Sequence, residues 1–570
     1  MSLIRKIFFS PKHRLRGLVL AFSIFGVCVS LITGAIVYNV FGEKQSFPEI
    51  AKHSDLTKQP LMTFADSLNI NFPSDESGNK NSTCQISGNN WISDENAKPG
   101  VSLDKNQWAD VDFRAASGSA LWINKDSVSC GDSVEIHASL YLHDRNTSPL
   151  RTFRALRVGW YNGAGARELW SSQPIKLEHR KIIQPKNNLR MVDTKWPVTT
   201  TFQIGNDWTP GLYLIISQDL NGKIDNLAPL VVKSPLATSK VLLLHSFLTW
   251  NLYNQFGGRS AYFGNGSTTL ERRNDRSRVV TMDRPIVGSG GFSIHRDAVS
   301  MVQFLEKNGI NYDQVSDLDI NKYPSILNSY NELILSGHAE YMTRRIFDSI
   351  VAARNTGVNL AIFGGNTALW QTRLTESPIG PERRIIMYRY ANEDPVTNLD
   401  EVTIEFGNSR LNIPQTLFTG AKPTGVHVYG NYKAVEIPSW LNIPKNSAIN
   451  GISPDSEIEA RNQNSLASPS NVKAIFAGNM SYADPSTTPP KASKKPLAEV
   501  IWFANQNGQA TFNAGLTTWA CNLVDTCAYA SVDEKSRTVM DEVTKEVVTL
   551  FSERGIGSKL NNYPASKTPR

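Results

Sequence analysis

The sequence of 570 residues predicts a fold in which a single N-terminal transmembrane helix precedes an all-β sandwich and a parallel α/β domain. Three patterns support this prediction: an uncharged apolar run at 17–41, short alternating runs within 107–235, and strands that alternate with helices within 236–556. Alternation of strand and helix is typical of a parallel sheet with helices on both faces. We therefore expect a mixed protein, all-β in one part and α/β in another.

The apolar run at 17–41 is long enough to cross a membrane. As a helix it would span about 36 Å, against a hydrocarbon core of about 30 Å. The flank at 1–16 carries Lys and Arg, which favour the cytoplasmic side, so the sequence predicts a single-pass cell-membrane protein. Its N-terminus would be cytoplasmic and the bulk of the chain extracytoplasmic. The small residues at 33–35 match a cleavage site only weakly, which favours an uncleaved anchor.

The exported part divides into regions by composition. Residues 42–106 are rich in Ser, Asn, Asp and Lys and have no apolar periodicity, which indicates a spacer. Region 107–235 has short alternating runs between turns, typical of an immunoglobulin-like sandwich of about seven strands. Region 236–556 shows the α/β alternation. A Pro/Asn/Ser-rich stretch at about 376–493 interrupts it and is expected to be an insertion over the catalytic face, and residues 557–570 form a tail.

The cysteines fit an oxidising compartment. Cys28 lies in the apolar run, which leaves an even set of four, and the sequence predicts two disulfides. Cys521 and Cys527 are the better-supported pair because they enclose a short loop, and Cys84 and Cys130 remain for the other. No Cys-x-x-Cys spacing indicates structural zinc. The net charge of +7 is scattered without a basic stripe, which argues against a nucleic-acid partner.

A histidine and a carboxylate follow the apolar strand at 333–335. His338, Glu340 and Tyr341 come within a few residues of its end. Because the loops at the carboxyl ends of parallel strands converge over one edge, polar groups there indicate a ligand site. We therefore expect an active site that includes Glu340. The aromatic-rich segment 250–262 follows the first buried strand and is expected at the same edge, although aromatic residues alone more often indicate packing.

Several ordered motifs in this sequence resemble the large (beta) subunit of N,N-dimethylformamidase. They are 159–167, Asp207–Tyr213, Trp250–Tyr262, Asp283–Pro285, His338–Tyr341, Gly364–Asn366 with Trp370 and Arg373, and Phe512–Ala520. The resemblance covers roughly residues 111–556. It implies a sandwich followed by a domain with the class I glutamine-amidotransferase-like α/β fold.

The resemblance also implies a site in which two tyrosinates and a glutamate hold one iron ion, with a histidine and a second glutamate nearby. Matched motif by motif, Glu340, Tyr253 and Tyr213 are the expected ligands of Fe³⁺, and Tyr262 is the alternative to Tyr213. Phenolate and carboxylate oxygens are hard donors that suit ferric iron. Zinc or manganese could occupy the same oxygen-rich site.

The same resemblance implies two catalytic groups that move protons. They are His338 and Glu457, with Glu459 as the alternative carboxylate. Six residues are expected to line the substrate pocket: Trp250, Asn254, Tyr262, Arg284, Tyr341 and Asn366.

The expected activity is metal-assisted hydrolysis of an amide or related non-peptide C–N bond by an extracytoplasmic enzyme. A thiol mechanism is excluded, because neither the turn at 337–341 nor that at 364–366 contains a cysteine. The substrate is expected to be a small molecule or an amide of the cell envelope, and the partner a small subunit or a second copy of the chain. The alternative is a non-catalytic cell-surface binding or envelope protein with a degenerate amidotransferase-like domain.

Overall fold

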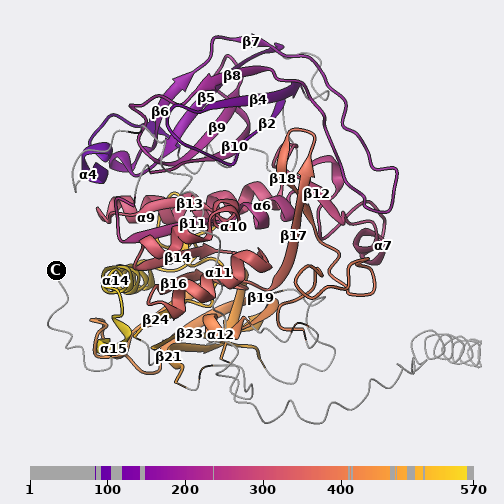
Figure 1. Ribbon diagram of the computed structural model, residues 1–570. Coiled ribbons are helices and arrows are strands. Elements are labelled where there is room, and N and C mark those ends of the chain that lie inside the picture. The colour runs from indigo at the N-terminus through magenta and orange to yellow at the C-terminus, as the bar shows by residue number, and fades with distance from the viewer. Residues whose placement is uncertain are drawn as a thin grey trace, which may run out of the picture. The chain divides into compact units, whose positions relative to one another are not determined.

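The computed structural model describes residues 84, 91–103, 118–140, 148–234, 237–408, 411, 415–461, 469, 471–483, 495–504 and 508–560 (Figure 1). All of them belong to one structural unit, Ser67–Arg570. Within these residues the fold is mixed α/β and consists mostly of sheets.

The first part of the described chain is a pair of sheets. The larger has the order β1 (Val101–Ser102), β6 (Gly165–Ser171), β5 (Leu150–Val158), β9 (Gly211–Gln218), β10 (Ile224–Val232), β3 (Ser127–Val128), and β7 (Ile175–Lys176) also pairs with β5. The smaller has the order β2 (Ser119–Ile123), β4 (Ser133–Leu140), β8 (Thr200–Gln203). Both are antiparallel, except that β3 pairs with β10 in parallel.

The two faces of β9 are buried against different partners. Tyr213 and Ile215 point into the core between the two sheets. The alternate residues Leu212, Leu214 and Ile216 belong to the large core that includes the α/β part. Successive side chains of a strand point to opposite faces. The larger sheet is therefore covered on both sides, which explains why β9 reads as a continuous apolar run.

The second part is built on one long sheet. Its order is β13 (Asp313–Ser316), β11 (Val241–His245), β14 (Glu332–Gly337), β16 (Asn359–Gly364), β24 (Ala510–Asn513), β23 (Leu497–Ala504), β21 (Lys473–Asn479), β19 (Lys422–Ala434), β20 (Ala448–Ala460), with β22 (Ser481–Tyr482) beside β19. The pairings from β13 to β24 are parallel and those from β24 to β20 are antiparallel.

The parallel half of this sheet has a switch in strand order. Taken in chain order, the parallel strands are arranged second, first, third, fourth and fifth, so the direction of progression reverses between β11 and β14. Ligands of open α/β sheets bind outside the carboxyl ends of the strands at such a switch point. A ligand site is therefore expected at the segments that follow β11 and β14.

Helices and one small sheet complete the described fold. The helices are α4 (Trp91–Asn96), α6 (Phe247–Tyr253), α7 (Thr269–Asn274), α8 (Ser289–Ser293), α9 (Ser300–Lys307), α10 (Asp317–Lys322), α11 (Arg344–Asn355), α12 (Thr416–Thr419), α13 (Trp519–Asn522), α14 (Glu534–Phe551) and α15 (Gly557–Leu560), with short turns η2 (Tyr161–Gly163), η3 (Phe256–Gly258), η4 (Ile294–Val299) and η5 (Pro324–Ser329). The small sheet has the order β12 (Val279–Thr281), β18 (Gly380–Ile386), β17 (Trp370–Ser377), β15 (Tyr341–Thr343). Side-chain caps fix the longer helices: Thr343 accepts a hydrogen bond from the first turn of α11, and Asp533 from that of α14.

The Pro/Asn/Ser-rich stretch at 376–493 continues the main sheet. Its strands β19, β20 and β21 join the antiparallel half through β23. Pairing of this kind satisfies the backbone polar groups of a segment whose side chains alone give weak strand signals. Residues from 376–493 therefore lie in the same sheet as the parallel strands, although they are distant from most of them in sequence.

The predicted fold class is wrong in its transmembrane helix. Among the described residues, no helix is long and apolar enough to cross a membrane. The longest of these helices, α14, carries charged residues along its length and packs its apolar face inward. The predicted span at 17–41 and its flank at 1–16 lie outside the described residues. The predicted single-pass membrane localisation is corrected accordingly, and the fold class becomes a mixed α/β fold made mostly of sheets.

The predicted disulfides are present. Cys84 is bonded to Cys130, and Cys521 to Cys527. The end of the predicted spacer also has structure, because α4 and β1 lie within 42–106, and β1 pairs with β6. The first bond ties the segment before α4 to the loop that leads into β4.

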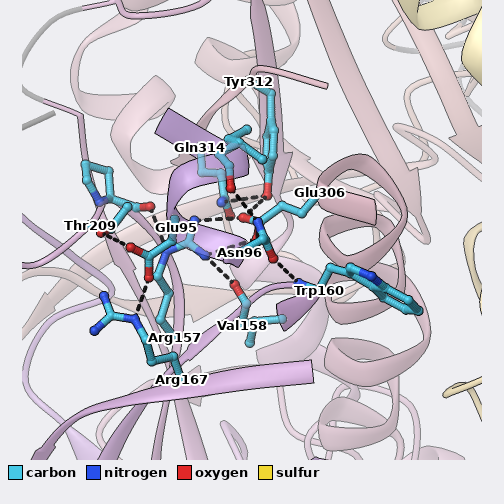
Figure 2. Close-up of polar contacts among 12 residues, drawn as sticks. Glu95, Asn96, Arg157, Val158, Trp160, Arg167, Thr209, Glu306, Tyr312 and Gln314 are labelled. Atoms are coloured by element: carbon cyan, nitrogen blue, oxygen red, sulfur yellow. Dashed lines mark hydrogen bonds and ion pairs between the residues drawn. The ribbon is translucent and has the colours of Figure 1, made fainter. Parts of the chain in front are cut away.

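A buried ion pair joins the larger sandwich sheet to α9 (Figure 2). Arg157 on β5 donates to both carboxylate oxygens of Glu306, at 2.7 and 3.1 Å, and neither side chain is exposed. Asn96 and Tyr312 also donate to Glu306. The residue pair thus fixes the sandwich against the helix that follows η4, and hence against the parallel sheet.

Candidate functional site

Two glycines shape the turn at the carboxyl end of β14. Gly337 has a φ of +67°, and a Cβ atom there would lie 2.0 Å from Asp297. A Cβ atom on Gly364, at the end of β16, would lie 1.9 Å from the carbonyl oxygen of Gly337. Only glycine fits such close backbone approach. The chain therefore leaves β14 sharply, and His338 to Glu340 lie at the switch point of the sheet.

Glu340 is the buried centre of the site. The hydroxyl of Tyr262 donates to its carboxylate, with oxygen distances of 2.7 and 2.6 Å, and Trp370 Nε1 donates to Oε1 at 3.1 Å. Burial raises the pKa of Glu340 to about 7, against the lowering effect of Arg389 and the phenol hydrogen bonds. Glu340 is therefore a desolvated carboxylate whose burial Arg389 and the phenol hydrogen bonds offset only in part.

Two tyrosines from the segment after β11 stack beside this carboxylate. The rings of Tyr253 and Tyr262 are 4.4 Å apart, and Tyr253 lies 5.4 Å from the ring of His338. Tyr341 meets both tyrosines edge-on. Burial, and then the negative charge of Glu340, raise the pKa values of Tyr253 and Tyr262 well above that of a free phenol. Without a cation at the site, both phenols stay protonated.

His338 lies between two carboxylates. Its Nε2 atom is 3.5 Å from Glu340 Oε2 and 3.3 Å from Glu457 Oε2, and it makes no hydrogen bond. Burial, and then the charges of Arg296 and His427, lower the pKa of His338 well below its usual value. The side-chain amide of Asn366 donates a hydrogen bond to Glu457. Burial raises the pKa of Glu457. We call Tyr253, Tyr262, His338, Glu340 and Glu457 the Glu340 cluster.

Arg389 was not identified from the sequence, yet it contacts this cluster. Its guanidinium carbon lies 3.7 Å from the ring centroid of Tyr262 and 4.6 Å from that of Trp370, and it donates to the hydroxyl of Tyr341 at 2.5 Å. Its backbone has a φ of +70°, a strained conformation for arginine. The residue follows β18 in the small sheet, and no local motif marks it as a site residue.

The donor set of the Glu340 cluster fits a hard metal ion. Within the described part of the chain, no three or more His, Cys, Asp and Glu side chains are grouped to hold a metal. A metal here would therefore depend on the phenol oxygens of Tyr253 and Tyr262 together with Glu340. Oxygen donors that include phenolates suit ferric iron. The unbonded Nε2 of His338 is close enough to Glu340 to act on a group held there.

Most sequence-predicted residues meet at this site, but Tyr213 does not. Its ring stacks on Trp208 in the sandwich core, and its hydroxyl donates to the carbonyl of Thr209 at 2.7 Å. The alternative, Tyr262, is the second tyrosine beside Glu340. Tyr341 and Asn366, which were predicted to line the substrate pocket, contact members of the Glu340 cluster.

Three residues predicted to line the substrate pocket make contacts that hold the segment after α6 in place. Arg284 is buried and donates to the carbonyls of residues 254, 256 and 259. Asn254 donates to the carbonyl of Pro285 and accepts from two backbone amides. Trp250 packs against Phe247 and His245. Their contacts fix the backbone that carries Tyr253 and Tyr262.

Glu459, the alternative second carboxylate, lies beneath the turn that carries Asn366. It accepts from Thr367 N at 3.1 Å and from Asn513 Nδ2 at 2.7 Å, and its side chain is buried. Burial raises its pKa to about 7, although these hydrogen bonds lower it. These two hydrogen bonds tie Glu459 to the turn at 366–367 and to β24.

We expect Glu459 to make folding stability depend on pH. Between its ordinary pKa near 4.5 and about 7, the folded state keeps a proton that the unfolded state has released. Stability therefore falls as pH rises through this window, by up to about 3 kcal/mol, and is then level. Urea unfolding at pH 5 and pH 8 should show a smaller fall for Glu459→Gln than for the native chain. Glu436→Gln, at an exposed position, is the control; equal falls in all three proteins would contradict the expectation.

Comparison with known proteins gives one informative match. The family model described as N,N-dimethylformamidase beta subunit-like, C-terminal, matches residues 152–531. No curated protein matches the chain. A solved structure of a Paenibacillus sp. cycloisomaltooligosaccharide glucanotransferase, complexed with cycloisomaltoheptaose, is 9% identical with a TM-score of 0.17, over 62% of this chain and 67% of that chain. A similarity that low carries no argument about this fold or its activity.

Proposed function

Because the chain belongs to the N,N-dimethylformamidase beta subunit-like family, we propose that it is an enzyme that hydrolyses an amide C–N bond of a small molecule. The observation that carries the proposal is the position of Glu340, between the hydroxyl of Tyr262 and the imidazole of His338. Groups of these types, buried together at the switch point of a parallel sheet, can bind a carbonyl and move a proton.

The proposed metal is Fe³⁺, and the residues proposed to hold it are Tyr253, Tyr262 and Glu340. Tyr262 takes the place first expected for Tyr213, because its hydroxyl lies within 2.7 Å of both oxygens of Glu340. When bound, the metal would polarise the amide carbonyl and make water more acidic. Arg389 lies over the ring of Tyr262, where its positive charge favours the phenolate form.

The protein side chains supply the proton transfers. His338 is proposed to take a proton from the attacking water and give it to the leaving amine nitrogen. Its Nε2 atom is available for this role because it makes no hydrogen bond. Glu457, held by Asn366, approaches the same Nε2 atom at 3.3 Å, where it is proposed to orient the imidazole.

The direct test is release of amine from short amides by the purified full chain. N,N-dimethylformamide, formamide and N-methylacetamide are suitable probes, with and without added ferric or ferrous iron. Amine release that follows the iron content supports the proposal. A folded, iron-loaded protein that releases no amine from any of these probes would favour the non-catalytic binding protein instead.

Tyr262→Phe is expected to weaken metal binding and lower amide hydrolysis by about 100-fold, because it removes a phenol oxygen and keeps the ring. A visible absorption band from phenolate-to-iron charge transfer should weaken with it. Tyr390→Phe is the matched control, because that phenol is 54% exposed and should leave both signals unchanged. An unchanged absorption band in Tyr262→Phe would remove this tyrosine from the proposed ligand set.

Two further properties are proposed on the same basis. The strand order of the parallel half, with its switch between β11 and β14, supports a class I glutamine-amidotransferase-like fold. The family description as a beta subunit supports assembly with a second, small subunit. Light scattering of the purified chain, alone and after co-expression with its neighbouring open reading frames, tests the second property.

A further inference from the structure

His427 lies directly opposite Glu457 in the antiparallel pairing of β19 with β20. Its Nε2 atom is 3.5 Å from Glu457 Oε1, and its side chain is 46% exposed. Neither the residue nor its strand carries a sequence motif. Its position was set by the pairing of two strands in the Pro/Asn/Ser-rich stretch.

The two oxygens of Glu457 lie near two different imidazoles. Oε1 faces His427, and Oε2 lies 3.3 Å from Nε2 of His338. Exposure falls along this series, from 46% for His427 to 15% for Glu457 and 6% for His338. Imidazole and carboxylate groups thus alternate from the surface to the buried Glu340.

Amide hydrolysis needs an exit for one proton when the amine leaves in its neutral form. Water adds its oxygen to the carbonyl carbon, the C–N bond breaks, and one proton of the water goes to the leaving amine. The acid product loses its remaining proton near neutral pH, and an amine that leaves in its neutral form takes up one proton after it reaches solvent. The overall reaction then releases no net proton, but the proton left by the acid must pass from the buried site to solvent before the next turnover. Side chains that accept and release protons in turn can carry it out of a buried site.

We propose that His427 is this exit, and that it passes protons between Glu457 and solvent. The proposal rests on the proposed amidase function. An imidazole is suited to the step because its ordinary pKa lies near neutrality. Burial raises the pKa of Glu457, so its carboxyl group can hold a proton closer to neutral pH than an exposed glutamate.

The charges around the pair are compatible with this role. Arg296 and Arg389 act on Glu457 and lower its pKa, which limits the effect of burial. His338 faces its inner oxygen. Tyr482 of β22 pairs with Val428, the residue after His427. The amide of Ala483 also donates to the carbonyl of His427 and fixes the backbone there.

The kinetic test uses His427→Gln. In dilute buffer, kcat for amide hydrolysis should fall roughly tenfold with KM unchanged, and added imidazole should restore it. Tyr429→Gln is the matched control, because that side chain lies on the same strand and is also 46% exposed. Equal kcat in the native chain and His427→Gln at every imidazole concentration would overturn the proposal and leave the amidase function intact.

A second measurement does not need activity. The ring of His427, labelled with ¹³C and identified from the His427→Gln spectrum, can be titrated by NMR in the native chain and in Glu457→Gln. Loss of the carboxylate should lower the pKa of His427 by a measurable shift. An unchanged titration would show that the two groups do not share a proton. If no amide is hydrolysed, the proposed function fails, whereas the NMR result still decides the pairing.

Discussion

Glu340→Gln is expected to lower the proposed amide hydrolysis by about a thousandfold and to abolish the proposed iron binding. The glutamine keeps the shape of the side chain but loses the negative charge of the carboxylate, which accepts hydrogen bonds from Tyr262 and Trp370. The native carboxyl group has a pKa of about 7, so a neutral side chain is already compatible with the fold at this position. The variant should therefore fold normally while losing activity and iron together.

Three measurements decide this prediction: initial rates of amine release, metal per chain, and the thermal unfolding midpoint. Glu376→Gln is the control, because Glu376 is an exposed carboxylate on β17. A loss of activity with full metal content would make Glu340 a proton carrier rather than a ligand. Activity above a tenth of the native rate would contradict a central role of either kind.

The strand-end turn could be predicted from sequence because its signal is local. A buried strand at 332–337 followed at once by His338 and Glu340 predicts polar groups at the carboxyl edge, and the structure has them there. Tyr253 could be predicted as a site residue for the same reason, since it follows the strand at 241–245. The strands there are short and apolar, with residues buried on both faces.

The choice between Tyr213 and Tyr262 could not be made from local pattern. Every residue of β9 up to Ser217 is buried, because one face meets the sandwich core and the other the α/β part. With both faces apolar, the period of two gives no sign of which way Tyr213 points. Its ring lies among sandwich residues, as does the carbonyl of Thr209 that its hydroxyl contacts.

His427 and Arg389 show a second limit of prediction from the sequence. Each reaches the Glu340 cluster through non-local pairing: His427 through β19 and β20, and Arg389 from the end of β18. The composition of 376–493 gives weak strand signals, so the register that places His427 opposite Glu457 was not readable. The N-terminal apolar run shows the converse error, because length and hydropathy alone were taken to fix the fold class.

Breaking the Arg157–Glu306 pair is expected to cost about 3–5 kcal/mol of unfolding free energy, the largest effect on stability that we predict. Both side chains are fully buried. Glu306→Gln leaves the guanidinium with neutral acceptors only, among them Tyr161 and the carbonyl of Pro210. A buried charge without its partner is far more costly than an absent pair.

The double variant Arg157→Met/Glu306→Leu separates charge from packing. Removing both charges should recover much of the loss, because the desolvation cost of each ion disappears with it. Urea unfolding of the two single variants and the double variant gives the coupling energy. Glu542→Gln, which breaks an exposed pair with Lys545, should change stability by less than about 1 kcal/mol. Additive losses in the double variant would show that the pair does not act as a unit. If the sandwich unfolds before the α/β part in the single variants, the ion pair drawn in Figure 2 is what makes the two parts unfold as one cooperative structure.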